Sequence, residues 1–135
     1  MQFKNYVEIN NEKFFLTENQ FNELQLKVRD LTLLNLHVIK GIENLRPFQS
    51  LYFENVAVRE GDILDLLTRL NMDHEREIIR LSFLNCGVKE IKNLEKIVNL
   101  QSLDLRSNKI KKITGLENLI NLRILKLDVN YISKI

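Results

Sequence analysis

Three stretches of eleven residues recur along the chain at a constant interval of 22 residues. They begin at Leu81, Leu103 and Leu125 and read LSFLNCGVKEI, LDLRSNKIKKI and LKLDVNYISKI. Each stretch is apolar at its first, third, eighth and eleventh positions and carries asparagine or cysteine at its sixth. This repeat constrains the fold more than any other feature, because a unit of this length must pack against its neighbours to be stable.

The apolar alternation within each stretch predicts a short strand. Leu103 and Leu105 place their side chains on one face, and the residues between them face the other way. The chain must then turn at Asn108, where a short amide can satisfy the backbone groups that the turn leaves unpaired. Cys86 takes the same place one repeat earlier, because a small thiol tolerates burial.

The repeat resembles the leucine-rich repeat family. The core L-x-x-L-x-L-x-x-N/C-x-L is present as Leu100, Leu103, Leu105, Asn108 and Ile110, and the run I-x-x-L-x-x-L is present as Ile113, Leu116 and Leu119. The resemblance is to the short 22-residue class, which includes repeats of type-1 phosphatase regulatory subunits and of bacterial internalins. It implies an α/β fold, a right-handed solenoid with a concave parallel sheet of about five strands.

The same register can be followed upstream with irregular spacing. Leu51 and Phe53 predict a strand with Val56 at the turn, and a further unit is predicted at Leu31, Leu33, Leu36 and Val38. The segment 41–45, GIENL, is similar to the segment 115–119, GLENL. Between Leu51 and Leu81, apolar residues at helical spacing predict a helix from Asp62, its N-cap, to Met72, followed by a polar loop over 73–77.

The N-terminal 27 residues do not follow the repeat. Tyr6–Ile9 and Lys13–Leu16 flank Asn10-Asn11 and predict a hairpin, and Thr17 with Gln20 resembles a capping box that opens a short helix to about Leu26. We therefore expect a hairpin-helix cap over 1–27 and a solenoid over 28–135, together one domain. A C-terminal cap is not visible, so truncation of a longer repeat protein, or self-association through the uncapped C-terminal end, are both hypotheses.

Composition limits the classes of function. With 135 residues and 44% hydrophobic content the chain fits one globular unit. The 20 basic and 18 acidic residues are spread along it, which argues against nucleic-acid binding. The sequence has no apolar run long enough to span a membrane and no export signal, and its lone cysteine excludes an internal disulfide. We expect a cytoplasmic protein.

Residue patterns for catalysis are scarce. His37 lies between apolar residues, and His74 in a polar loop lacks the spacing of a metal-binding helix. Cys86 is expected to be buried and therefore unreactive. We predict neither catalysis nor a cofactor or metal site.

The remaining candidate is the concave side of the sheet, whose side chains point away from the core and which we predict to bind a partner protein. Its central lane is predicted as Thr32, Tyr52, Ser82, Asp104 and Lys126, and the neighbouring lanes as Leu34, Glu54, Leu84, Arg106 and Asp128, and Asp30, Ser50, Arg80, Ser102 and Ile124. The predicted binding residues are Tyr52, Glu54, Arg80, Leu84, Asp104, Arg106, Lys126 and Asp128. An aromatic and an arginine among small polar groups are typical interface anchors, although pairs such as Asp104 with Lys126, or Glu54 with Arg80, are alternatively solvent-facing ion pairs between strands.

Three hypotheses about function follow. The first is a non-catalytic protein-protein interaction module, or scaffold, that binds its partner on the concave face. The second is a structural block of a larger assembly that packs through its open end, with Tyr131 and Ile135 in contact. The third is a fragment of a bacterial surface adhesin, which requires an export signal in the parent gene.

Overall fold

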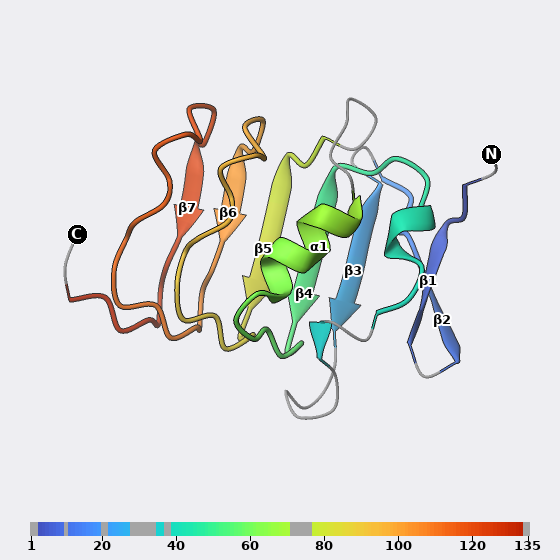
Figure 1. Cartoon of the computed structure of the whole chain (residues 1–135), viewed down its shortest axis with the longest axis horizontal. Helices are drawn as coiled ribbons and strands as arrows, with labels where there is room; N and C mark the ends of the chain where they lie inside the picture. The colour runs from blue at the N-terminus through green and yellow to red at the C-terminus, as the bar shows by residue number, and fades with distance from the viewer. Residues whose placement is uncertain are drawn as a thin grey trace.

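The structure is a computed structural model of the chain that describes residues 3–9, 11–19, 22–27, 35–36, 39–70 and 77–133. Its main element is a parallel sheet of five strands, which pair in the order of the sequence (Figure 1). The strands are β3 (Glu23–Lys27), β4 (Ser50–Glu54), β5 (Arg80–Leu84), β6 (Ser102–Asp104) and β7 (Ile124–Lys126).

The register of the sheet confirms the predicted stacking of the repeats. Leu81 lies opposite Leu103, which lies opposite Leu125. Upstream, Leu51 pairs with Leu81. The same pairing brings Phe53 beside Phe83, and their rings stack with centroids 5.3 Å apart. Equivalent apolar side chains therefore meet across the strands and form a continuous core.

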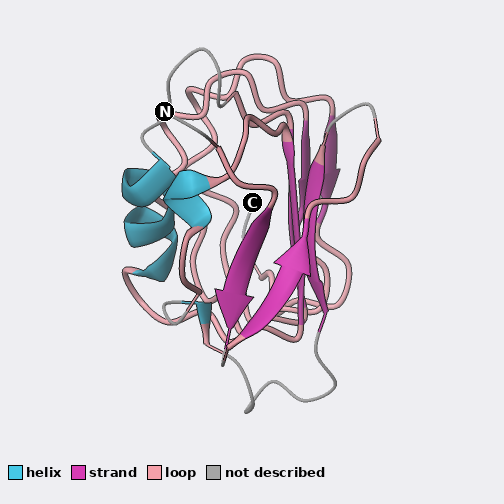
Figure 2. Cartoon of the chain, turned by 90° about the vertical axis from the view of Figure 1, so that its right-hand side faces the viewer, coloured by secondary structure: helices cyan, strands magenta, loops and turns pink. Residues whose placement is uncertain are grey.

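The return segments that connect the strands complete this core from the opposite side. Apolar residues at three-residue spacing are buried in them, at Ile39, Ile42, Leu45 and Phe48 and again at Ile91, Leu94, Ile97 and Leu100. Figure 2 shows the helices on one side of the molecule and the sheet on the other. The architecture is α/β, and it is consistent with a leucine-rich repeat fold.

The helix α1 (Asp62–Leu70) confirms the helix predicted in the longest unit. Its buried face includes Leu66, Leu67 and Leu70, and Arg69 donates to the carbonyl of Ile39 at 2.6 Å, next to the short helix η2 (Ile42–Asn44). The predicted N-cap role of Asp62 is wrong: the helix begins at Asp62, whose carboxylate instead accepts the backbone N–H of Arg59 at 2.7 Å. The end predicted at Met72 and most of the polar loop after it lie outside the described residues.

The N-terminal hairpin is confirmed. Strands β1 (Tyr6–Ile9) and β2 (Glu12–Phe15) are antiparallel, with Ile9 opposite Glu12. The hairpin contacts the first return segment through the bridges from Lys4 to Leu45 and from Glu8 to Lys40. It thereby covers one end of the apolar core, into which Val7 is buried.

The helix predicted from Thr17 to Leu26 is wrong, because Glu23–Lys27 is strand β3. Leu24 and Leu26 are buried and alternate with exposed Gln25 and Lys27, a period of two that outweighs the resemblance to a capping box. β3 pairs with β4, so Leu24 lies opposite Leu51.

The repeat unit predicted at Leu31 and Leu33 does not supply the strand next to β4. The first strand beside β4 is β3, and residues 28–34 lie outside the described part of the chain. Leu36 is not at the turn position of Val56, because the parallel bridge from Asn35 to Ala57 aligns Leu36 with Val58. The division into a cap over 1–27 and a solenoid over 28–135 stays a prediction.

Candidate protein-interaction surface

The outward side of the five strands forms one panel, which we call the sheet face. Its members, in three lanes, are Gln25, Tyr52, Ser82, Asp104 and Lys126; Lys27, Glu54, Leu84, Arg106 and Asp128; and Glu23, Ser50, Arg80, Ser102 and Ile124. All eight residues predicted for partner binding lie on it. Gln25, Lys27 and Glu23 take the places predicted for Thr32, Leu34 and Asp30, which lie outside the described residues.

The sheet face extends beyond the short strands β6 and β7. The backbone N–H of Asn85 donates to the carbonyl of Arg106, and that of Ser107 donates to the carbonyl of Asp128. Parallel pairing therefore continues past the strand ends. It brings Leu84, Arg106 and Asp128 side by side, although Arg106 and Asp128 lie outside the strands as defined.

Tyr52, in the central lane of the sheet face, is held in place by Glu54 and Lys27. Its hydroxyl donates to Glu54 Oε1 at 2.7 Å, and Lys27 Nζ lies 5.3 Å from the centre of its ring. Partial burial, followed by the hydrogen bond and the negative charge of Glu54, raises the pKa of Tyr52 to about 12. The ring is therefore a neutral, ordered platform with a charged rim.

Asp104 and Arg106 form a bidentate pair on the same face. Arg106 Nε donates to Asp104 Oδ1 at 2.9 Å and Arg106 Nη2 donates to Asp104 Oδ2 at 2.7 Å. This hydrogen-bonded carboxylate raises the pKa of the Arg106 guanidinium. The ion pair considered for Asp104 with Lys126 is therefore wrong, because the carboxylate faces the guanidinium two residues further along its own chain segment.

The lane of Arg80 is lined by hydroxyls. Arg80 is exposed and lies between Ser50 and Ser102 in the register. Ser50 is buried, and its hydroxyl donates to Glu23 Oε2 at 2.8 Å, which ties β4 to β3 at the margin of the sheet face.

A groove of about 640 Å³ follows the strand ends at one border of the sheet face. Its lining residues are Glu54, Asn55, Leu84, Asn85, Arg106, Ser107, Asp128 and Val129. The sequence reasoning missed Asn55, Asn85, Ser107 and Val129, all of which have positive φ. A signal was present, since each of them immediately precedes the sixth position of a repeat and asparagine tolerates this conformation better than most residues.

The asparagines predicted at the turns after the strands stabilise the backbone beneath the sheet face. Asn108 is buried and donates to the carbonyls of Phe83 and Leu105 at 2.7 and 2.9 Å. Asn130 repeats the pattern one unit later, with bonds to Leu105 and Leu127. The prediction that a short amide satisfies the backbone groups of the turn is thus confirmed at Asn108 and repeated at Asn130.

Cys86 occupies the equivalent position one repeat before Asn108. Its thiol is fully buried and faces the carbonyls of Leu84 and Phe53 at 3.3 and 3.5 Å. Burial raises the pKa of Cys86 to about 12, so the nucleophilic thiolate is strongly disfavoured.

The search for metal ligands and membrane spans concerns only the ranges that the structure describes. In them, no group of three or more histidine, cysteine, aspartate and glutamate side chains is placed to hold a metal ion. None of the described helices has the length and apolarity that crossing a bilayer requires. His37 and His74 lie outside these ranges.

Comparison with known protein families agrees with this architecture. Residues 98–135 match the family described as Leucine Rich repeats, in two copies. This match supports a leucine-rich repeat family for residues 98–135, and the register of the sheet extends the same arrangement upstream to β4. No curated protein matches the chain. Domains of this family generally mediate protein-protein interaction and are typically non-catalytic.

Proposed function

We propose that the chain is a non-catalytic interaction module that binds a partner protein on the sheet face. In this proposal the repeats coil as a right-handed solenoid and the sheet face is its concave side. The observation that carries it is the ordered set of anchors at the centre of the face, where Tyr52 is braced by Glu54 and Lys27, and Arg106 by Asp104.

Pre-ordered anchors favour binding for an energetic reason. A tyrosine and an arginine that are already held by neighbours lose less side-chain entropy when a partner arrives. Both residue types are enriched among those that dominate binding energy at interfaces. Leu84 lies opposite Glu54 and beside Arg106 in the register and supplies an apolar contact.

The charges of the sheet face would restrict which partner fits. Glu54 and Asp128 flank Leu84 and Arg106 along one lane, while Arg80 and Lys126 lie in the other two. A partner of matching but opposite pattern would be selected, because like charges brought together at an interface are strongly disfavoured. We therefore expect a polar interface with a small aromatic and aliphatic centre.

Site-specific photocrosslinking in extracts of the native cell tests this proposal. The crosslinking residue p-benzoylphenylalanine would replace Tyr52 on the sheet face, Tyr131 near the end of the chain, or exposed Lys96 as a matched control. A discrete adduct from position 52 and none from position 96 is the expected result. The same adduct from position 96, or adducts from position 131 only, would contradict binding on the sheet face.

A second candidate, a structural block that packs end to end, is favoured by the exposure of apolar residues around β7. Leu125 is 37% exposed, Tyr131 65% and Val129 76%. Self-association through this end would cover them. A molecular mass in sedimentation that stays that of one chain at all concentrations would rule it out.

We further propose a cytoplasmic location, where the buried thiol of Cys86 would stay reduced. Fractionation of the native cell tests this. Recovery of the protein at the cell surface would favour the adhesin hypothesis instead.

A further inference from the structure

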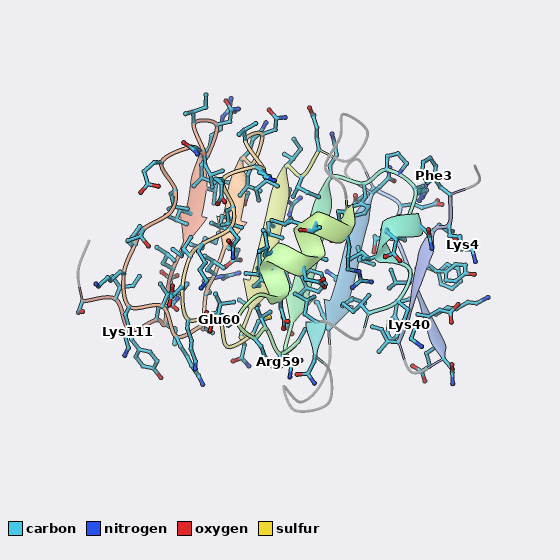
Figure 3. All side chains as sticks on the ribbon, viewed as in Figure 1. Phe3, Lys4, Lys40, Arg59, Glu60 and Lys111 are labelled. Atoms are coloured by element: carbon cyan, nitrogen blue, oxygen red, sulfur yellow. The ribbon has the colours of Figure 1, made fainter. Side chains whose placement is uncertain are left out.

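A second hollow lies outside the sheet face, at the edge where the chain leaves the sheet at the strand ends. Figure 3 shows Lys111 at this edge, with Arg59 and Glu60 further along it. The hollow has a volume of about 650 Å³. We call it the lysine groove, and its lining residues include Lys89, Lys109, Lys111, Lys112, Glu90 and Tyr131.

Two neighbouring repeats supply the lysines of the lysine groove. Lys89 and Lys111 follow Val88 and Ile110, which are both buried, so the two lysines occupy the same exposed place in successive repeats. The backbone N–H of Lys109 donates to the carbonyl of Val88 at 2.8 Å. The repeat therefore places the chain segments that carry these lysines next to each other.

Tyr131 belongs to the next repeat and closes the groove on its other side. Its backbone N–H donates to the carbonyl of Ile110 at 2.9 Å, and its side chain is 65% exposed. The groove thus combines several cations with one aromatic ring that offers apolar contact area.

The positive charge of the groove is not balanced within the described part of the chain. Among the described residues, none forms an ion pair with Lys89, Lys109, Lys111 or Lys112. Glu90 is the one acidic residue in the lining, and its carboxylate faces Lys92 at 3.8 Å. Because the whole protein has a formal charge of only +2, this is a local concentration of cations.

We propose that the lysine groove binds an acidic segment of a partner protein, as a second contact surface separate from the sheet face. Each exposed ammonium presents three donors to carboxylates, and the Tyr131 ring can pack against the aliphatic part of a bound side chain. A nucleic acid fits less well, because proteins that bind its phosphate backbone can make about six to ten phosphate contacts. The groove supplies four free lysines within a single hollow.

Fluorescence anisotropy with a labelled hexaglutamate peptide tests the proposal on the whole chain. We expect saturable binding that weakens by about tenfold when salt is raised from about 0.05 M to about 0.3 M, since exposed charges are screened over such distances. The double variant Lys109→Glu with Lys111→Glu should weaken binding at least about fivefold, because each reversal replaces an attraction by a repulsion.

A matched double variant, Lys40→Glu with Lys96→Glu, makes the same change in net charge on exposed residues outside the groove. Its binding should stay within about twofold of the unchanged protein. Equal weakening in both double variants would overturn the proposal, because net charge alone would then explain it. Tighter binding of a single-stranded oligonucleotide of equal charge would also overturn it, in favour of nucleic acid.

Two further measurements keep the result interpretable. Thermal unfolding must show that both double variants are folded, which is the expected outcome because the side chains of these exposed lysines have no described partner. The variant Tyr52→Ala with Arg106→Ala should bind hexaglutamate normally, since both residues lie on the sheet face. Failure of the lysine groove would leave binding on the sheet face untouched, and the reverse also holds.

Discussion

The side-chain oxygen of Asn108 accepts the backbone N–H of Cys86, which lies 22 residues earlier, at a distance of 3.0 Å. The same oxygen accepts the N–H of Val88 at 3.1 Å, while the amide nitrogen donates to the carbonyls of Phe83 and Leu105. One side chain therefore satisfies backbone groups of two neighbouring repeats. The turn that follows β5 therefore depends on Asn108, which belongs to the next repeat.

Replacing Asn108 by alanine should be strongly destabilising. The change leaves several buried backbone groups unpaired, and each such group costs about 1 to 3 kcal/mol. We expect the free energy of unfolding in urea to fall by about 3 kcal/mol or more. The control Asn99→Ala removes an amide that bonds Glu77 at 3.0 Å outside the core, and should cost less than about 1 kcal/mol. Equal losses in the two variants would contradict the supporting role of Asn108.

The turns of the return segments give a second prediction. Gly115 and Gly41 have φ of +74° and +84°, a conformation that alanine adopts with strain. A Cβ on Gly115 would also lie 2.5 Å from the carbonyl oxygen of Ile91, whereas one on Gly41 would meet no atom within 4 Å. Gly41→Ala should therefore cost about 1 kcal/mol from backbone strain alone. Gly115→Ala should cost clearly more in the same urea titration, and the opposite order would contradict the close contact with Ile91.

Val129 marks a position where the sequence conflicts with the backbone. Its φ is +58°, which disfavours a β-branched residue, and its side chain is 76% exposed. Asparagine occupies the equivalent positions 55 and 85. Val129→Asn should therefore raise the free energy of unfolding by about 1 kcal/mol, because it relieves strain and sacrifices little burial. The matched control Val98→Asn, at a residue that is 45% exposed, should not raise it.

The strands from β5 to β7 could be predicted from the sequence because a strict repeat fixes both period and register. Once Leu81, Leu103 and Leu125 are aligned, the outward lanes follow from alternation alone. The turn residues Cys86 and Asn108 follow in the same way. The 22-residue spacing is therefore a sufficient signal for the positions of Leu84 and Arg106. Tyr52 follows instead from the local alternation of Leu51 and Phe53, which lie 30 residues before Leu81 and Phe83.

The first strand of the sheet, β3, could not be placed from the spacing of the repeat. Leu24 pairs with Leu51, 27 residues later, so the interval departs from the repeat just where the sequence suggested a helix start at Thr17. The partner of Asp104 was equally out of reach, because both Lys126 and Arg106 are neighbours on the sheet face. Which of the two it contacts depends on side-chain rotamers that strand periodicity does not determine.

The ionisation of Tyr52 provides a last test, now of the sheet face itself. Its pKa is raised to about 12 by burial first and by Glu54 second. A phenol whose pKa is higher in the folded than in the unfolded chain stabilises the fold below the unfolded value of 10.0, and this contribution is lost as the pH rises from there to about 12. Subtracting the ultraviolet titration of Tyr52→Phe from that of the unchanged protein should isolate one phenol that ionises near pH 12.

The variant Glu54→Gln identifies the cause of this shift. It removes the negative charge that Tyr52 faces at 2.7 Å, so the pKa of the tyrosine should fall toward 10.0 but stay above it, since burial is the larger cause. An Asp128→Asn variant removes a charge of the same sign from the same lane and should leave the titration of Tyr52 nearly unchanged. A phenol that titrates at 10.0 in the unchanged protein would mean that Tyr52 is not held against Glu54 in solution, and the anchor at the centre of the proposed interface would then lack its order.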